Sequence, residues 1–98
     1  MRITFFPSRG DAPMSLSRLG GSLVIDGQEI ALDSYVAGAH ERIIGQPELV
    51  DGEWHVDLVL PHGANAGDAA LFPERLTLDG DGPVALPPFD ADEAVFSI

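Results

Sequence analysis

Apolar and polar residues alternate in short runs along this chain, and an Asp-Gly pair interrupts three of the runs. The interrupted runs cover residues 23–32, 49–56 and 76–86. Asp-Gly between alternating apolar residues is typical of the tight turn of a β-hairpin, because both central residues of that turn need a positive φ. The pattern therefore predicts three β-hairpins.

The first hairpin follows from a two-residue turn at Asp26-Gly27, which pairs Leu23 with Ile30. Alternate side chains of a strand point to opposite faces, so the pairing divides the hairpin into an apolar face and a more solvent-exposed face. The apolar face carries Leu23, Ile25, Ile30 and Leu32, and the more solvent-exposed face carries Ser22, Val24, Glu29 and Ala31.

A turn at Asp51-Gly52 builds the second hairpin. It pairs Leu49 with Trp54, Pro47 with Val56, and Ile43 with Leu60. These residues and Leu58 form one apolar face, while Glu48, Glu53, His55 and Asp57 lie on the other. Pro47 has no N–H for the ladder, so we expect it at an edge or a bulge.

The third hairpin needs a three-residue loop, Gly80-Asp81-Gly82. Only this length pairs Leu78 with Val84 and Leu76 with Leu86 on one apolar face. Such a loop places a glycine in the left-handed region, so we expect Gly82 at a positive φ.

Further short strands are expected over residues 2–6 and 15–19, whereas helix is expected only within 65–72, for one or two turns at most. The 11 glycines and 8 prolines favour a turn-rich chain. The sequence thus predicts a small all-β protein, an antiparallel sandwich or open barrel of about eight short strands built from the three hairpins. Residues 1–88 form a single domain, and residues 89–98, after Pro87-Pro88, form an extension.

The charge is strongly negative and unevenly distributed. The 98 residues contain 16 acids against 5 bases, a net charge of −11, and no cysteine. Residues 1–25 have a net charge of +2, whereas residues 26–98 have −13. The acidity argues against direct binding to nucleic acid or anionic membranes. The missing cysteines exclude disulfides and thiol chemistry, and the start of the chain lacks the apolar run of a signal peptide.

Two patterns suggest metal ligands, and each has a simpler interpretation. His55 and Asp57 have the spacing of a non-haem iron site, which His40 or His62 would complete, but they also fall on the polar face of a hairpin. Asp79-Gly80-Asp81 resembles the start of a calcium loop that would close at Asp90, but prolines intervene and the hairpin explains the glycines. No nucleophile elbow or phosphate loop is present. We therefore expect no enzymatic activity and no cofactor.

Two segments are candidates for contact with a partner protein. The long connection after residue 60 is either an ordered packed loop or a contact loop, with Pro61, His62, Asn65 and Phe72 as the contact residues. The extension ends on large apolar residues, which favours docking on this domain's own edge or on a neighbouring subunit. Its contact residues are Phe89, Val95, Phe96 and Ile98.

Several segments resemble a family of proteins of about this length that temperate tailed phages and prophages encode in their tail modules. The segments are Arg2-Ile3-Thr4-Phe5, Ile25-Asp26-Gly27-Gln28-Glu29, Leu60-Pro61-His62-Gly63-Ala64-Asn65-Ala66, Leu71-Phe72-Pro73 and Gly80-Asp81-Gly82-Pro83-Val84-Ala85-Leu86-Pro87. Residues 34–46 and the final ten fit the family pattern least.

The resemblance implies a structural or assembly protein of the tail tip, baseplate or fibre attachment, located in the virion tail or in the host cytoplasm during assembly. Its partners would be other tail proteins or further copies of the chain. The acidity leaves an alternative open, an acidic decoy that inhibits a host nucleic-acid-binding protein.

Overall fold

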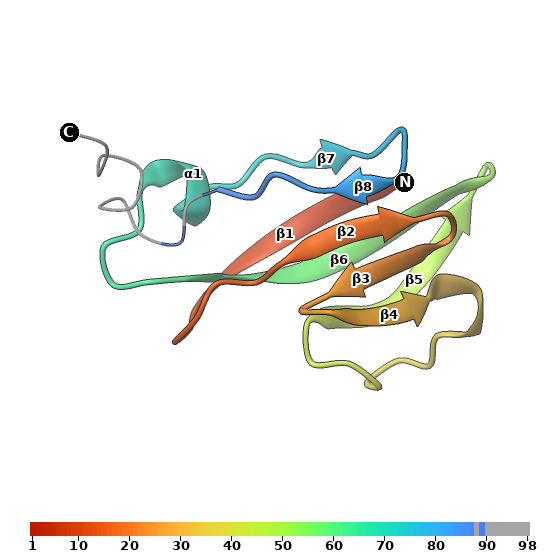
Figure 1. The fold of residues 1–98 in the computed structure, drawn as a ribbon, viewed down its shortest axis with the longest axis horizontal. Helices are drawn as coiled ribbons and strands as arrows, with labels where there is room; N and C mark the ends of the chain where they lie inside the picture. Colours follow the sequence, from red (N-terminus) through yellow and green to blue (C-terminus); the bar gives the residue numbers. More distant parts are fainter. Residues whose placement is uncertain (88, 90–98) are drawn as a thin grey trace.

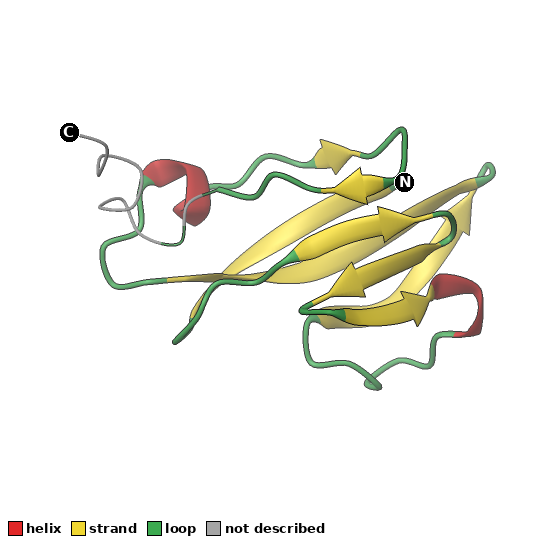
Figure 2. Cartoon of the chain, in the orientation of Figure 1, coloured by secondary structure: helices red, strands yellow, loops and turns green. Residues whose placement is uncertain are grey.

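The computed structural model describes residues 1–87 and 89, and these form two four-stranded β-sheets (Figures 1 and 2). The first sheet has the strand order β5-β6-β1-β7 and the second the order β4-β3-β2-β8. The strands are β1 (Arg2–Arg9), β2 (Leu16–Leu19), β3 (Ser22–Ile25), β4 (Gln28–Ala31), β5 (Ile43–Val50), β6 (Glu53–His62), β7 (Leu76–Thr77) and β8 (Gly82–Pro83). A 3-10 turn, η1 (Leu32–Ser34), and one helix, α1 (Asp68–Leu71), complete the described elements.

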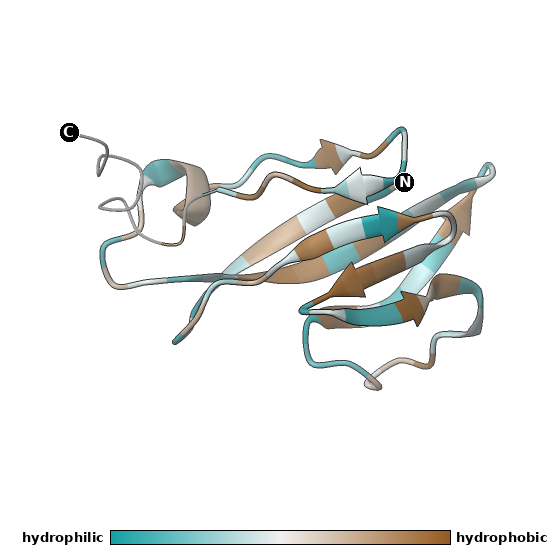
Figure 3. Cartoon of the chain, in the orientation of Figure 1, coloured by the Kyte–Doolittle hydropathy of each residue, from teal (hydrophilic) through white to brown (hydrophobic). Residues whose placement is uncertain are grey.

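One hydrophobic core joins the two sheets. Its fully buried members include Ile3 of β1 and Leu58 of β6 from the first sheet, with Leu23 and Ile25 of β3 from the second. Figure 3 shows β3 as almost wholly hydrophobic and the start of β4 as hydrophilic, in keeping with an inner strand beside an edge strand. The all-β class and the two-sheet arrangement are confirmed, and the described strands close no barrel.

The first hairpin has the predicted register. Leu23 pairs with Ile30 and Ile25 with Gln28 across the turn. Asp26 has φ 51° and Gly27 has φ 85°, as a turn with two left-handed residues requires. The predicted apolar face is the buried one, and the Asp-Gly pair together with the alternation was enough to specify it.

The register predicted for the second hairpin is confirmed next to its turn but is wrong farther from it. Leu49 pairs with Trp54, but Ile43 pairs with Leu58 rather than Leu60, because the ladder is interrupted between Ile44 and Glu48. Residues 45–47 lie opposite one residue of β6. Gly45 has a positive φ there, and Pro47 has no N–H to continue the ladder. Pro47 therefore lies at a bulge, as expected, and the bulge shifts the register by two residues.

The predicted exposure of Leu49 is also wrong. The alternation predicts Leu49 on the apolar face, yet the residue is 58% exposed. The turn between β5 and β6 projects past the ends of β2 and β3 (Figure 1), so the second sheet does not cover this end of the hairpin.

The third predicted hairpin does not form. Instead, β7 pairs with β1 and β8 pairs with β2, so the two strands belong to different sheets. The Leu78 N–H donates to the Met1 carbonyl at 2.7 Å, and the Val84 N–H donates to the Leu16 carbonyl at 2.8 Å. Splitting the pair supplies a partner to β1 and to β2, which a hairpin would have left unpaired on that side. Gly82 has φ 125°, so its positive φ is confirmed.

The first sheet is mixed rather than antiparallel. β1 and β6 pair in parallel over eight residue pairs, from Arg2 opposite His55 to Arg9 opposite His62. Parallel neighbours need a long crossover between them. Here β2, β3, β4 and β5 form that crossover, so the hairpin pattern alone could not predict the pairing.

Helix within residues 65–72 is confirmed as a single short helix. It covers Asp68–Leu71, and its N-cap residue is Gly67. The Phe72 N–H donates to the Asp68 carbonyl at 2.8 Å and closes the helix. Asp68 and Ala69 of this helix line a pocket.

Candidate functional site

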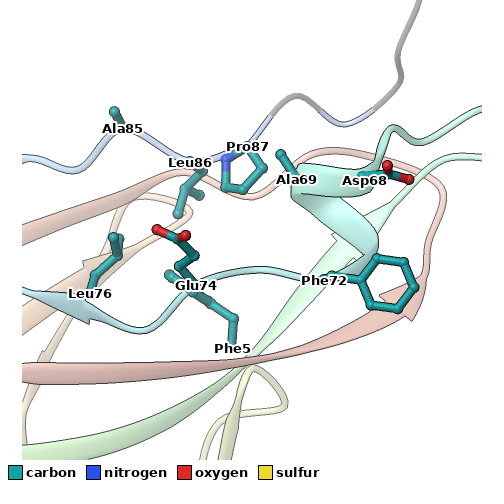
Figure 4. A pocket seen from close by; sticks show the side chains of 9 residues that line it. All are labelled: Phe5, Asp68, Ala69, Phe72, Glu74, Leu76, Ala85, Leu86 and Pro87. Carbon is teal, nitrogen blue, oxygen red and sulfur yellow. The ribbon is translucent and has the colours of Figure 1, made fainter.

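A pocket of about 480 Å³ lies beside α1 (Figure 4). Its lining residues come from β1, from α1 and the chain after it, from β7, and from the segment after β8. They are Phe5, Asp68, Ala69, Phe72, Glu74, Leu76, Ala85, Leu86 and Pro87. The volume is within the range of roughly 300–1,000 Å³ that is usual for ligand pockets.

The pocket exists because β7 and β8 belong to different sheets. Leu76 of β7 and Leu86 after β8 are half-buried and pack against the core, and Phe5 of β1 is buried between them and α1. The segments before β7 and after β8 continue toward α1 (Figure 1). A hairpin of the predicted kind would have paired Leu76 directly with Leu86, whereas here both line the hollow.

Phe72 is the most exposed large hydrophobic residue of the described chain. Its side chain is 77% exposed although its backbone is held by the closing hydrogen bond of α1. Figure 4 shows its ring at the α1 end, pointing away from the other lining residues. The ring is therefore positioned by the fold but not packed into it.

The charged residues of the pocket lining are two carboxylates, Asp68 and Glu74. Neither is in an ion pair with a described residue, although Glu74 is followed by Arg75 in the sequence. In Figure 4 the Glu74 carboxylate points toward Leu86, whereas the Asp68 carboxylate points outward with Phe72. The site has an apolar floor and an acidic rim.

Of the other predicted contact residues, the described ones, Pro61, His62, Asn65 and Phe89, are not part of this lining. Pro61 is buried and His62 is half-buried at the end of β6, where the His62 carbonyl accepts the Gly10 N–H at 3.0 Å. Asn65 is exposed in the loop before α1, and Phe89 is half-buried, with its carbonyl accepting the Gly63 N–H at 2.8 Å. Val95, Phe96 and Ile98 lie outside the described residues. Phe72 alone of the described candidates lines the pocket.

The sequence-based search missed Phe5, Asp68, Glu74 and the leucines of the lining as site residues. In the sequence the leucines indicate only an apolar strand face, and the two carboxylates are ordinary members of an acidic chain. Nothing in the linear pattern indicates that β7 and β8 separate. The detectable signal was Phe72 followed by Pro73, a large aromatic residue in a segment of small residues.

The suggested iron ligands do not gather. His55 and Asp57 lie on one face of β6, and His55 Nε2 is 3.6 Å from Glu53 Oε1. His40 lies in the loop before β5, where its Nδ1 accepts the Arg42 N–H at 3.0 Å. Within residues 1–87 and 89, no three acidic or histidine side chains converge as a metal site would require.

The Asp79-Gly80-Asp81 segment has a structural role that needs no ion. Asp81 Oδ1 accepts a hydrogen bond from the Gly20 N–H at 2.8 Å. This bond links the loop before β8 to the turn between β2 and β3. The suggested closing ligand, Asp90, lies outside the described residues.

A second, smaller hollow of about 250 Å³ runs along the edge strand β4. The loop after η1 forms its other wall, and the Tyr35 hydroxyl braces that loop by accepting the His40 N–H at 3.0 Å. Val36, 70% exposed, lies in its lining. This hollow is half the volume of the pocket beside α1.

The described residues define a mostly-β protein of two four-stranded sheets with an apolar, acid-rimmed pocket at one end. Comparison with models of protein families, with curated proteins and with solved structures gave no match. None of the helices in the described part of the chain has the length and apolar character needed to cross a membrane.

Proposed function

We propose that this protein is a non-enzymatic structural or assembly protein of a phage tail, and that it acts by binding another protein at the pocket beside α1. The observation that carries the proposal is Phe72, a large aromatic residue that is 77% exposed and lines an apolar pocket. Large aromatic residues beside apolar pockets dominate the binding energy of many protein interfaces. The resemblance of several sequence segments to the tail-module family supports the tail assignment.

The test replaces Phe72 in the phage and measures the protein in purified virions. Phe72→Asp puts a charge where the ring would be buried, and we expect its association with tails to fall by about tenfold or more, the loss typical of an interface anchor. Val36→Asp is the matched control, because Val36 is similarly exposed, at 70%, but lines the other hollow. Circular dichroism of both variants establishes that they fold.

Two results would contradict the proposal. One is normal tail assembly and normal incorporation of the Phe72→Asp protein. The other is tails that assemble and infect normally when the gene is deleted.

The acid excess supports a second candidate, an inhibitor that mimics nucleic acid and occupies a host nucleic-acid-binding protein. Fifteen of the 16 acids follow residue 25, and they give residues 26–98 a net charge of −13. High negative charge on a small domain is what phosphate mimicry requires. If tagged protein retains no nucleic-acid-binding host protein at physiological salt, this candidate fails.

A further inference from the structure

We propose that the partner contributes a segment in which an apolar side chain is flanked by basic side chains. The inference rests on the proposed function, since it names the chemistry that the pocket beside α1 recognises. It follows from how apolar and charged groups are divided within the lining.

The floor of the pocket selects an apolar side chain. Phe5 is only 6% exposed, and Leu76 and Leu86 are half-buried against the core. Water in the pocket would therefore contact apolar side chains on several sides. Replacing that water with an apolar side chain is favourable in proportion to the area covered. The floor residues, Phe5, Leu76 and Leu86, carry no charge.

The rim selects positive charge on both sides of that apolar group. Figure 4 shows the Glu74 carboxylate directed toward Leu86, and the Asp68 carboxylate at the opposite, outer end of the lining, at the start of α1. The lining contains no arginine or histidine to neutralise them.

Charge also argues against the protein's own segments as the occupant. Residues 90–98 carry Asp90, Asp92 and Glu93 and no base, and no arginine follows Arg75. A second copy would bring another net charge of −11 to an acidic rim. The complementary occupant is therefore a basic and apolar segment of a different protein.

The test uses a capped peptide, Gly-Arg-Leu-Arg-Gly, titrated into the full-length protein and followed by amide chemical shifts in NMR spectra. We expect the shifts to concentrate at the lining, notably Ala69 and Ala85, and the affinity to fall as salt is raised. Gly-Glu-Leu-Glu-Gly and Gly-Arg-Ser-Arg-Gly are the matched peptides, and both should bind more weakly.

The protein variants isolate the two carboxylates. Asp68→Asn with Glu74→Gln should weaken binding by about three- to tenfold, as expected for two partly exposed ion pairs. Asp33→Asn with Glu41→Gln removes the same charge from exposed sites outside the lining and should change the affinity by less than about twofold.

Three results would overturn the inference: no binding of Gly-Arg-Leu-Arg-Gly up to about 10 mM, equal binding of the acidic or the serine peptide, or equal losses in the two double variants. Each would leave the proposed function standing if Phe72→Asp still removes the protein from tails. Normal tails with Phe72→Asp would instead contradict the proposed function itself.

Discussion

Asp26 links three segments of the chain as well as turning it between β3 and β4. Its Oδ1 accepts the Ser15 N–H at 3.0 Å, and its own N–H donates to the Ser15 carbonyl at 3.1 Å. Its Oδ2 lies 3.6 Å from Arg42 Nε, in the loop before β5. The turn was predictable from two adjacent residues, whereas the links to Ser15 and Arg42 depend on segments brought near by the fold.

Asp26→Ala should cost about 1–2 kcal/mol more free energy of unfolding than Asp51→Ala. Both aspartates have φ 51° at the same turn position, so the backbone penalty of alanine is shared. The difference comes from the side-chain hydrogen bond and ion pair of Asp26. Urea unfolding of the two variants measures it, and equal losses would show that the links add no stability.

Gly82→Ala should destabilise the protein by about 1–2 kcal/mol, whereas Gly80→Ala should leave its stability nearly unchanged. A Cβ at either position meets no atom within 4 Å, so steric contact is not the cause. Of these two glycines, only Gly82 has a positive φ, 125°. Thermal unfolding distinguishes them, and a loss at Gly80 as large as at Gly82 would contradict the explanation.

At the scale of elements, pairing is decided by which edges remain free. β7 and β8 are only two residues long, and each completes a different sheet by pairing with β1 or β2. β1 and β6, in contrast, are paired in parallel over eight residues in the middle of their sheet. The sheets therefore have a well-paired centre and short C-terminal edge strands.

Hydrogen exchange should reflect this difference. Amides within the β1–β6 ladder should exchange slowest, by global unfolding. The Leu78 and Val84 amides, which pair β7 and β8 with their neighbours, should exchange faster, by on the order of a hundredfold, through local opening. NMR-detected exchange in D₂O measures both groups. If Leu78 and Val84 exchange as slowly as β1 and β6, the C-terminal strands unfold only with the whole molecule.

At the scale of the whole molecule, we expect net repulsion to outweigh the specific ion pairs. The chain has a net charge of −11, while its described ion pairs, such as Arg2 with Glu53 and Arg42 with Asp26, each span 3.6 Å. Long, partly exposed pairs contribute little, whereas a high net charge opposes the compact state. Added salt should therefore weaken the overall repulsion more than it weakens the attraction within the ion pairs.

We expect the Tm to rise by about 2–5 °C between 0.02 and 0.3 M NaCl, corresponding to less than about 1 kcal/mol for a domain of this size. Equal concentrations of KCl provide the control, because screening depends on ionic strength rather than on the cation. A Tm that falls with salt would mean that attractive pairs dominate after all.

The sequence by itself determined the features that depend on neighbouring residues. These are the all-β class, the turns at Asp26-Gly27 and Asp51-Gly52, the face that β3 buries, the positive φ of Gly82 and the short helix before Phe72. Alternation and turn residues act over a few positions, so the structures that they specify can be predicted from the local sequence. The sequence indicated Phe72 as a contact residue, but it did not indicate the pocket that Phe72 lines.

Only the tertiary structure decided the parallel pairing of β1 with β6, the separation of β7 from β8 and the bulge register of β5. These depend on which distant backbone groups lack partners once the core has formed, and an unpaired backbone group is costly wherever it lies. The pocket results from the same competition, because β7 and β8 joined two different sheets and left Leu76 and Leu86 on either side of a hollow rather than on one hairpin.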